Sequence, residues 1–332
     1  MHVQKGIIMK RFALIGAGGY IAPRHMKAIR DTGNKLVVAT DPFDSVGILD
    51  QYFFDVAYFK EFERFDRHIE KLRRMGETKK IDYVSICSPN YLHDAHIRFA
   101  LRVGATPICE KPLVLNPWNL NALEKLEEEF DRKINSILQV RFHPSIIKLK
   151  KKIDSAQDQI YDIDLTYITS RGKWYDYSWK GDLEKAGGIE INIGIHFFDM
   201  LLWIFGKKKH SELHINESRK KAGYLELENA RIRWFLSLDR EDLPGEALLE
   251  NKTTYRSIKI NGKEIEFSNG FTNLHTVSYR NILEGNGFGI KDVRPVMNLL
   301  YDIRKSRPTG VKIEYSNPLI YKKSEKEYAA VV

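Results

Sequence analysis

The apolar positions in the first part of the chain form short continuous runs separated by amphipathic stretches. A run of roughly four to eight apolar residues is typical of a buried strand, whereas apolar residues three and four apart predict a helix. The runs lie at residues 12–15, 36–39, 83–87, 107–109 and 137–140, and the helical stretches lie at 21–30, 91–103 and from 116 onward. Strands that alternate with helices predict a doubly wound parallel sheet.

After residue 140 the pattern changes to alternation between apolar and polar positions, which predicts half-buried strands. The alternating apolar residues are Tyr161, Ile163, Leu165 and Tyr167 in one segment and Ile232, Trp234, Leu236 and Leu238 in another. Asn261-Gly262 is a strong hairpin signal. Its apolar flanks are Ile258, Ile260, Ile265 and Phe267. We also expect helices at residues 194–205, 274–283 and 292–305.

The fold class is therefore α/β: a Rossmann-type doubly wound parallel sheet is followed by an α+β domain with a large, mostly antiparallel open sheet. The change of pattern predicts a domain at residues 1–140 and a second at residues 141–332, and 332 residues exceed what one core usually serves. Because an open sheet leaves a face or an edge that needs cover, we expect an oligomer.

The amino-acid composition limits the kinds of partner that we expect the protein to bind. Lys and Arg total 53 against 44 Asp and Glu, a net charge of +9, but acidic residues are interleaved with the basic ones, so we expect no nucleic acid. Two cysteines, Cys87 and Cys109, supply neither a disulfide framework nor a four-ligand metal site, so we expect no metal and a reducing, cytoplasmic location. No run approaches the ~18 apolar residues of a membrane helix. Met9-Lys10-Arg11 directly precedes the first apolar run, and we leave residues 1–8 out of the fold prediction.

A glycine cluster lies between the first predicted strand and helix, where a dinucleotide pyrophosphate can approach the backbone. The strict G-x-G-x-x-G pattern fails because its sixth position is Ile21, but a longer version fits with Gly16, Gly19 and Ala22. Asp41 ends the second predicted strand, where a carboxylate can accept both ribose hydroxyls of NAD and would repel the 2′-phosphate of NADP. The alternative is that Asp41 only opens a turn with Pro42.

Glu110-Lys111-Pro112 follows a buried strand, so Lys111 is expected at the carboxyl edge, where ligands bind in such sheets. An isolated loop lysine is usually only solvated. However, Ser88-Pro89-Asn90 and His93 follow another strand at the same edge. A glycine-rich run that contains Asn192 and His196 lies where the second domain begins a helix.

The glycine turn, Ser88-Pro89-Asn90, Glu110-Lys111-Pro112 and the run from Gly187 to Asp199 together resemble the Gfo/Idh/MocA oxidoreductase family, in the family's order along nearly the whole chain. The resemblance implies an NAD-dependent enzyme that acts on CH–OH groups. The cofactor contacts it implies are Gly16, Gly19, Tyr20, Ile21, Asp41, Ser88, Asn90, His93, Glu110 and Lys111.

Three segments, at residues 19–26, 165–172 and 270–276, are more narrowly similar to the UDP-N-acetylglucosaminuronate 3-dehydrogenases of that family. This implies oxidation of the C3 hydroxyl of a UDP-sugar uronate to a 3-keto sugar nucleotide, in the biosynthesis of diacetamido-uronic acid sugars for surface polysaccharide such as the lipopolysaccharide O-antigen. It also implies a homotetramer, and some relatives regenerate NAD⁺ with 2-oxoglutarate.

The residue types agree with that chemistry, because the C3 oxygen becomes alkoxide-like as hydride leaves. His196 is the expected base, and Lys111 is the expected cation and orienting donor. Many relatives carry Asp where this chain has Asn192. Because an amide cannot act as a base, Asn192 keeps a hydrogen-bonding role. A histidine that opens a helix can also be purely structural.

The loop from Ser170 to Lys180 mixes cations with aromatic residues, which suits an anionic ligand that carries a flat ring. The expected substrate contacts are Lys111, Arg171, Lys173, Trp174, Tyr175, Asn192 and His196, with Lys180 also aimed at an acidic ligand. The rival interpretation is a protein interface, because Trp, Tyr and Arg are also interface residues. Arg141 and His143 are weaker ligand candidates, and the two cysteines are expected to be inert.

Two other functions stay open. The first is a dehydrogenase of the same family that acts on another sugar or on a cyclitol. The second is a non-catalytic NAD-binding sensor, which Asn192 in place of the usual Asp would favour.

Overall fold

The computed structural model describes residues 9–44, 46–156, 159–265 and 272–321. Contacts divide the chain into two compact units. The first unit holds the described residues up to Val114, together with Trp118–Phe142 and Thr272–Val293. The second holds Leu115–Pro117, the described residues from His143 to Ile265, and those from Arg294 onward.

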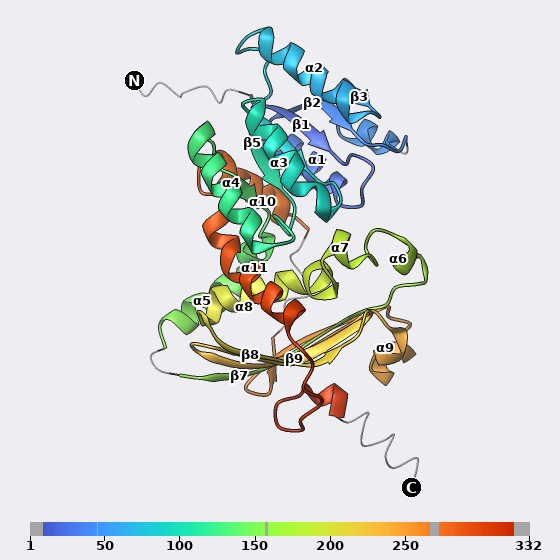
Figure 1. Cartoon of the computed structure of the whole chain (residues 1–332), viewed down its shortest axis with the longest axis vertical. Coiled ribbons are helices and arrows are strands. Elements are labelled where there is room, and N and C mark those ends of the chain that lie inside the picture. The colour runs from blue at the N-terminus through green and yellow to red at the C-terminus, as the bar shows by residue number, and fades with distance from the viewer. Residues whose placement is uncertain (1–8, 45, 157–158, 266–271, 322–332) are drawn as a thin grey trace. The chain divides into compact units, whose positions relative to one another are not determined.

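The first unit is built on a six-stranded sheet in which every strand pair is parallel (Figure 1). Its strands are β1 (Arg11–Ile15), β2 (Lys35–Thr40), β3 (Ala57–Phe59), β4 (Tyr83–Ile86), β5 (Thr106–Cys109) and β6 (Asn135–Ser136). The order is β3-β2-β1-β4-β5-β6, so the direction of winding reverses between β1 and β4. Ligands bind at such a switch point, outside the carboxyl ends of the strands.

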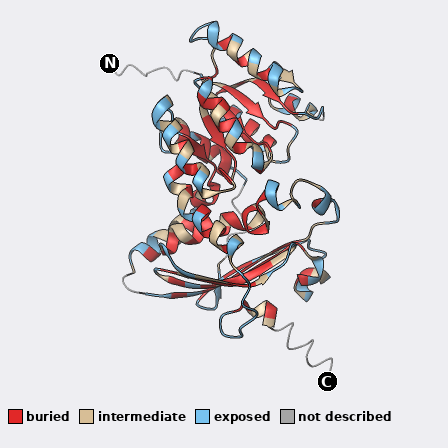
Figure 2. Ribbon diagram, viewed as in Figure 1, coloured by how far each residue is buried: buried red, intermediate tan, exposed pale blue. Residues whose placement is uncertain are grey.

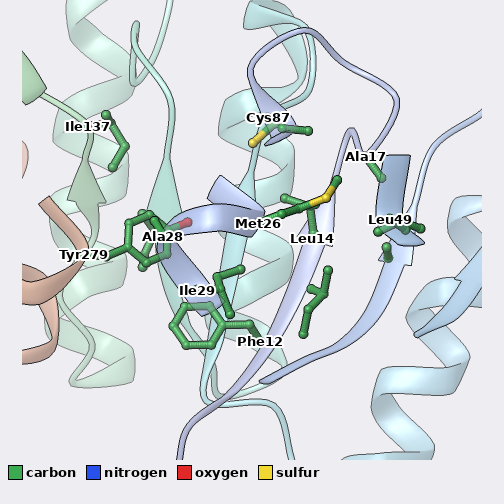
Figure 3. Packing of buried hydrophobic residues seen from close by; sticks show 14 of the residues in the cluster. Phe12, Leu14, Ala17, Met26, Ala28, Ile29, Leu49, Cys87, Ile137 and Tyr279 are labelled. Carbon is green, nitrogen blue, oxygen red and sulfur yellow. The ribbon is translucent and has the colours of Figure 1, made fainter. Parts of the chain in front are cut away.

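Helices pack on this sheet through apolar side chains. They are α1 (Ala22–Asp31), α2 (Phe62–Arg74), α3 (His93–Arg102), α4 (Pro117–Phe130, from Trp118 on in this unit) and α10 (Leu274–Leu283). Phe12 and Leu14 of β1 share one buried cluster with Met26 and Ile29 of α1 and Tyr279 of α10 (Figure 3). The helices α2 and α3 also pack against each other, because the rings of Phe62 and Phe65 on α2 contact the ring of Phe99 on α3.

The second unit contains a six-stranded mixed sheet of order β12-β11-β7-β10-β9-β8. Its strands are β7 (Tyr161–Thr169), β8 (Lys208–Asn216), β9 (Lys220–Leu227), β10 (Ala230–Ser237), β11 (Thr254–Ile260) and β12 (Lys263–Glu264). Only β7 and β10 pair in parallel, so the predicted mostly antiparallel sheet is confirmed. The predicted hairpin is also present, with φ of 49° at Asn261 and 77° at Gly262, as its turn type requires. Phe267 lies outside the described residues.

Helices cover both faces of this second sheet. They are α5 (Pro144–Asp154), α6 (Trp174–Tyr177), α7 (Leu183–Ala186), α8 (Ile195–Phe205), α9 (Gly245–Leu249) and α11 (Ile290–Lys305, from Arg294 on in this unit). On one face α8 packs through Phe198 on Trp234. On the other face, where α9 lies (Figure 1), Ala247 and Ile320 belong to a smaller apolar cluster. Figure 2 shows buried residues along the strands of this sheet.

One helical stretch among the described residues, Leu183–Phe205, is long and apolar enough to cross a membrane by length and composition. We expected no such stretch from the sequence. Most of it is buried inside the protein, as in the core helix of a soluble protein.

Most predicted elements lie where the patterns placed them, with three differences. The strand predicted at residues 137–140 is wrong: the pairing is made by β6 before it, and Gln139–Phe142 form a 3-10 turn. Several elements were not predicted from the sequence, among them the strands β3, β8 and β9 and the helices α2 and α5. Finally, Thr272–Val293 belong to the first unit, so a single boundary at residue 140 does not describe the division. The roles assigned to the two domains stay predictions.

We predict that Asn317→Ala destabilises the second unit. The Asn317 side chain is 1% exposed and donates to Leu165 O at 3.0 Å and Arg233 O at 3.3 Å, which fixes the terminal segment on β7 and β10. Losing these bonds should lower the free energy of unfolding by about 2 kcal/mol, measured by urea denaturation. The exposed Asn286→Ala should change it by less than about 0.5 kcal/mol. Equal stability of the two variants would contradict the role of Asn317.

Candidate functional site

The turn after β1 brings the backbone close to the carboxyl end of the sheet. Gly16 has a φ of +86°, and a Cβ there would lie 2.7 Å from the carbonyl of Cys87, so the position requires glycine. The Gly16 and Ala17 N–H groups donate to Thr40 O at 2.9 and 3.2 Å, and the Gly19 N–H donates to Gly16 O. Gly16 and Gly19, both predicted from the sequence, therefore shape a tight turn whose backbone a ligand can approach.

Asp41 lies at the end of β2 and faces this turn. Its Oδ2 accepts the Gly18 N–H at 2.9 Å, and its Oδ1 accepts the Phe43 N–H at 3.0 Å. Tyr58 donates its hydroxyl to the Asp41 carbonyl at 2.7 Å. The carboxylate is thereby fixed, and each oxygen retains a lone pair for a hydroxyl donor such as a ribose. The arrangement fits the adenosine ribose of NAD.

The start of α1 completes this cofactor site. Its N-cap residue, Ile21, has no side-chain oxygen that could cap the first N–H groups of the helix, and Pro23 occupies the first turn. Such a helix end attracts anions, and a pyrophosphate fits there. Tyr20, also predicted to contact the cofactor, is 86% exposed beside it.

Polar side chains follow the ends of β4 and β5 and are hydrogen-bonded within the unit. Ser88 Oγ lies 2.8 Å from His96 Nδ1, and Asn90 is buried in the next turn. His93 contacts Pro112 O at 2.7 Å through Nδ1 and Ser88 O at 2.8 Å through Nε2. Burial lowers the pKa of His93, so its neutral ring donates to one of these carbonyls at a time. The predicted residues Ser88, Asn90 and His93 thus lie together.

Glu110 and Lys111 follow β5. The Glu110 carboxylate is buried, and it accepts the Lys111 N–H at 3.2 Å and ring nitrogens of His25 and His275 at 2.9 and 3.0 Å. Burial alone would raise the pKa of Glu110, but the bonds from the two histidines hold it well below its usual range. The Lys111–Pro112 peptide is cis. The predicted cofactor contact of Glu110 stays a prediction, since its carboxylate is engaged inside the unit.

In the second unit, Asn192 lies in a π-helical turn, Glu190–Gly194, that leads directly into α8, where His196 is the second residue. The Asn192 Nδ2 donates to the Tyr175 hydroxyl at 2.6 Å. Two predicted residues, Asn192 and Tyr175, thus come together, because the π turn meets the loop from Ser170 to Lys180 (the 171–180 loop) at Tyr175. Such irregular helical turns are frequent at functional sites.

The 171–180 loop is held by Arg219, which the sequence patterns did not single out. Its guanidinium donates to Asp176 at 2.8 Å, to Asp239 at 2.6 Å and to the Arg171 carbonyl at 2.7 Å. With the Leu238 carbonyl, which accepts at 3.2 Å, four groups around one planar cation fix the loop without using the Arg171 side chain. No pattern marks Arg219, since its partners lie far away in the sequence.

Lys180 lies among aromatic rings at the end of this loop. Its Nζ is 5.5 Å from the Trp174 ring centre and 5.8 Å from that of Trp179. Burial, and then the charge of Arg171, lower the pKa of Lys180. A nearby anion would offset both the cost of burying the Lys180 charge and its repulsion by Arg171. Lys173, predicted to contact substrate, is exposed at the start of α6.

A buried ion pair under the π turn was also missed by the sequence analysis. Lys221 of β9 lies 2.9 Å from Glu190, and both side chains are almost fully buried. Lysine is rarely buried unless it is paired. The pair links the sheet to the turn that carries Asn192.

The weaker candidates have local partners. Arg141 binds the Asp292 carbonyl at 3.1 Å and stacks over Phe288, while His143 Nδ1 accepts the Ser145 N–H at the start of α5. Both cysteines are buried, and burial raises the pKa of each thiol. These thiols are therefore poor nucleophiles.

A glycine turn at the switch point of a parallel sheet, with a carboxylate at the end of β2, defines a dinucleotide-dependent oxidoreductase domain. The chain belongs to the Gfo/Idh/MocA oxidoreductase family: residues 10–138 match its NAD-binding Rossmann fold and residues 157–263 its C-terminal alpha/beta domain. NAD is the cofactor, as predicted.

Solved structures extend the comparison. The chain is 46% identical to the WlbA (WbpB) dehydrogenase of Thermus thermophilus in complex with NAD and alpha-ketoglutarate, with a TM-score of 0.89 over 93% of this chain and 99% of that one. A second structure of that enzyme, 45% identical, has the same TM-score and coverage and holds NAD and UDP-GlcNAcA.

Among curated proteins, inositol 2-dehydrogenase of Rhizobium meliloti is 29% identical over 204 residues, which are 60% of this chain and 56% of that protein. The match thus spans about half the length of that relative.

We predict that His96 makes stability depend on pH. Burial lowers its pKa from 6.5 to about 4, so the unfolded chain takes up a proton before the folded one. The stabilisation that the folded state gains from a neutral His96 ring is fully present above pH 6.5. As the pH falls toward 4, the free energy of unfolding decreases by up to about 3 kcal/mol. In His96→Asn the free energy of unfolding should fall less steeply over this range. The exposed His210→Asn should behave like the wild type, and identical slopes for all three would contradict the assignment.

Proposed function

We propose that the protein oxidises the C3 hydroxyl of UDP-N-acetylglucosaminuronate with NAD⁺. One observation carries the proposal: the 171–180 loop presents Lys180 among two indole rings and beside the charge of Arg171. This chemistry suits an acidic ligand with a flat ring, as a uridine diphosphate uronate is. The likeness to the Thermus enzyme that holds UDP-GlcNAcA supports the same substrate.

In this reaction His196 takes the proton from the C3 hydroxyl while the C3–H bond breaks as hydride, leaving a ketone. NAD⁺, when bound, accepts that hydride and becomes NADH. Lys111 donates a hydrogen bond to the C3 oxygen and stabilises its growing negative charge. Gly16, Gly19, Tyr20, Ile21 and Asp41 hold the cofactor, and Ser88, Asn90 and His93 line the same edge of the sheet.

Asn192 has an orienting role in this scheme. Its amide donates to the Tyr175 hydroxyl at 2.6 Å, which fixes the orientation of the side chain. An amide does not titrate, so proton transfer falls to His196.

The proposal extends to the wider setting. We place the enzyme in the cytoplasm as a homotetramer that serves surface-polysaccharide biosynthesis. The relative solved with NAD and alpha-ketoglutarate supports that 2-oxoacid as the partner that reoxidises NADH.

A second candidate is a dehydrogenase that acts on a cyclitol or on another sugar, which the inositol 2-dehydrogenase likeness favours. The two candidate functions differ in their substrates, because a cyclitol carries neither a carboxylate nor a diphosphate that Arg171 and Lys180 could bind. Asn192 favours a non-catalytic NAD sensor, although His196 keeps a base available.

The substrate prediction is tested with purified protein, NAD⁺ and a panel that holds UDP-GlcNAcA, UDP-GlcNAc, UDP-glucose and myo-inositol. We expect NADH, followed at 340 nm, with UDP-GlcNAcA, and a kcat lower by about 100-fold or more in His196→Asn because the base is lost. Turnover of myo-inositol alone would favour the second candidate. Full activity of His196→Asn would contradict its role, and NAD binding without turnover of any compound would favour the sensor.

Lys180→Met should weaken binding of the sugar nucleotide more than it slows chemistry. The thioether keeps the contact with the indoles but removes the charge, so KM for UDP-GlcNAcA should rise about tenfold while kcat stays within about threefold. Lys185→Met, which removes a more exposed lysine of α7, is the matched control and should leave both unchanged. An equal KM in the two variants would exclude an ionic contact from Lys180.

A further inference from the structure

A buried chain of hydrogen bonds lies beneath Lys111, and neither the sequence analysis nor the proposed reaction uses it. The Glu110 Oε1 lies 2.9 Å from His25 Nε2 and 3.0 Å from His275 Nε2. On the far side of His25, Nδ1 lies 2.7 Å from the Tyr279 hydroxyl, which lies 2.6 Å from Ser85 Oγ. The five side chains come from α1, β4, α10 and the end of β5, all in the first unit.

The directions of the hydrogen bonds in this chain follow from the ionised Glu110 carboxylate and from the neutral ring of His25. The ionised carboxylate only accepts, so His25 and His275 both carry hydrogen on Nε2. Burial lowers the pKa of His25, which keeps its ring neutral, so its Nδ1 accepts the Tyr279 hydroxyl proton. Tyr279 in turn accepts from Ser85. Each hydrogen bond therefore has one defined donor, and the series of hydrogen bonds ends at the Glu110 carboxylate.

Aromatic packing fixes these groups in position. The Tyr279 ring stacks on Phe12 with centres 5.9 Å apart and meets the His25 ring edge-on at 5.6 Å. The two histidine rings are also edge-to-face, at 5.2 Å. Figure 3 shows the Tyr279 ring among the apolar side chains of β1 and α1. These groups have little freedom to turn away from Glu110.

The same three groups, His25, Glu110 and His275, offer ligand atoms within 4.8 Å of one another, which a metal ion could use. However, the contacts have hydrogen-bond lengths, and the protons of His25 and His275 occupy the Nε2 atoms that a metal would need. The hydrogen bonds alone therefore account for the cluster, and a bound metal becomes an outcome of the test.

We propose that His25 and His275 are positioning residues for Lys111. They hold the Glu110 carboxylate in one place, its Oε2 accepts the Lys111 N–H, and this contact sets where the lysine side chain leaves the sheet. On the other side of Lys111, the Pro112 carbonyl contacts His93. The residue that binds the C3 oxygen is thus held on both sides. This inference rests on the proposed function for the role of Lys111.

The test compares His275→Gln, whose amide can place an N–H donor where Nε2 lies, with His275→Leu, which has none. We expect His275→Leu to lower kcat for UDP-GlcNAcA about tenfold or more, with KM for NAD⁺ within about threefold, and His275→Gln to restore kcat to within about threefold of wild type. If His275 had only a structural role, kcat would fall to a similar extent in both variants, or kcat and the KM values would change together. His214→Leu, which removes another buried histidine in the second unit, is the control and should keep the wild-type kcat.

A second readout does not depend on turnover. In ¹⁵N-labelled protein, the amide proton of Lys111 should resonate downfield in the wild type and in His275→Gln, and move upfield in His275→Leu and in Glu110→Gln, where its acceptor loses charge. An unmoved resonance in both of these variants would overturn the inference. If the wild type turns over no UDP-GlcNAcA, the proposed function fails, while the resonance still reports whether the histidines control Lys111.

The two histidines also have a tautomer that NMR can read. We expect hydrogen on Nε2 of both rings, where each faces the Glu110 carboxylate. One equivalent of metal in the purified protein by elemental analysis, with loss of the Nε2 hydrogens, would overturn the inference in favour of a metal site.

Discussion

The ionised carboxylate of Glu110 imposes a demand that much of the first unit is arranged to meet. A buried charge is costly unless several donors surround it, and the end of β5 supplies the Lys111 N–H. The others must come from His25 on α1 and His275 on α10. The need for these donors gives a physical reason for a helix from late in the chain to pack on a sheet built from its first 136 residues.

The second unit meets a comparable demand with a cation. Arg219 gathers Asp176, Asp239 and the Arg171 carbonyl, and so gives a definite shape to a loop that contains only one short helix. Lys221 holds the π turn in a similar way, through its ion pair with Glu190. In both units the residues expected to touch ligand are thus held by charged groups behind them. This is the arrangement that keeps polar side chains fixed before a ligand arrives.

Sequence patterns marked the residues that we expect to face a ligand, but they did not mark the residues behind them. Gly16 and Asp41 follow from local rules, because a turn and a strand end are each encoded by neighbouring residues. His25, His275 and Arg219 act through partners far away in the chain, and nothing in a short window marks them. The failed strand at 137–140 has the opposite cause: an apolar run is equally compatible with a buried 3-10 turn, and only the pairing of β5 with Asn135 and Ser136 settles the register.

The return of Thr272–Val293 to the first unit has a consequence for the order in which the chain folds. As the protein emerges from the ribosome, β1 to β6 appear first, but α10 follows only after the whole mixed sheet of the second unit has been made. Until then His25 and Glu110 lack His275, and Phe12 lacks the ring of Tyr279. The nucleotide-binding unit is therefore completed only after the mixed sheet of the second unit has been made, although its first strand is made near the beginning of synthesis.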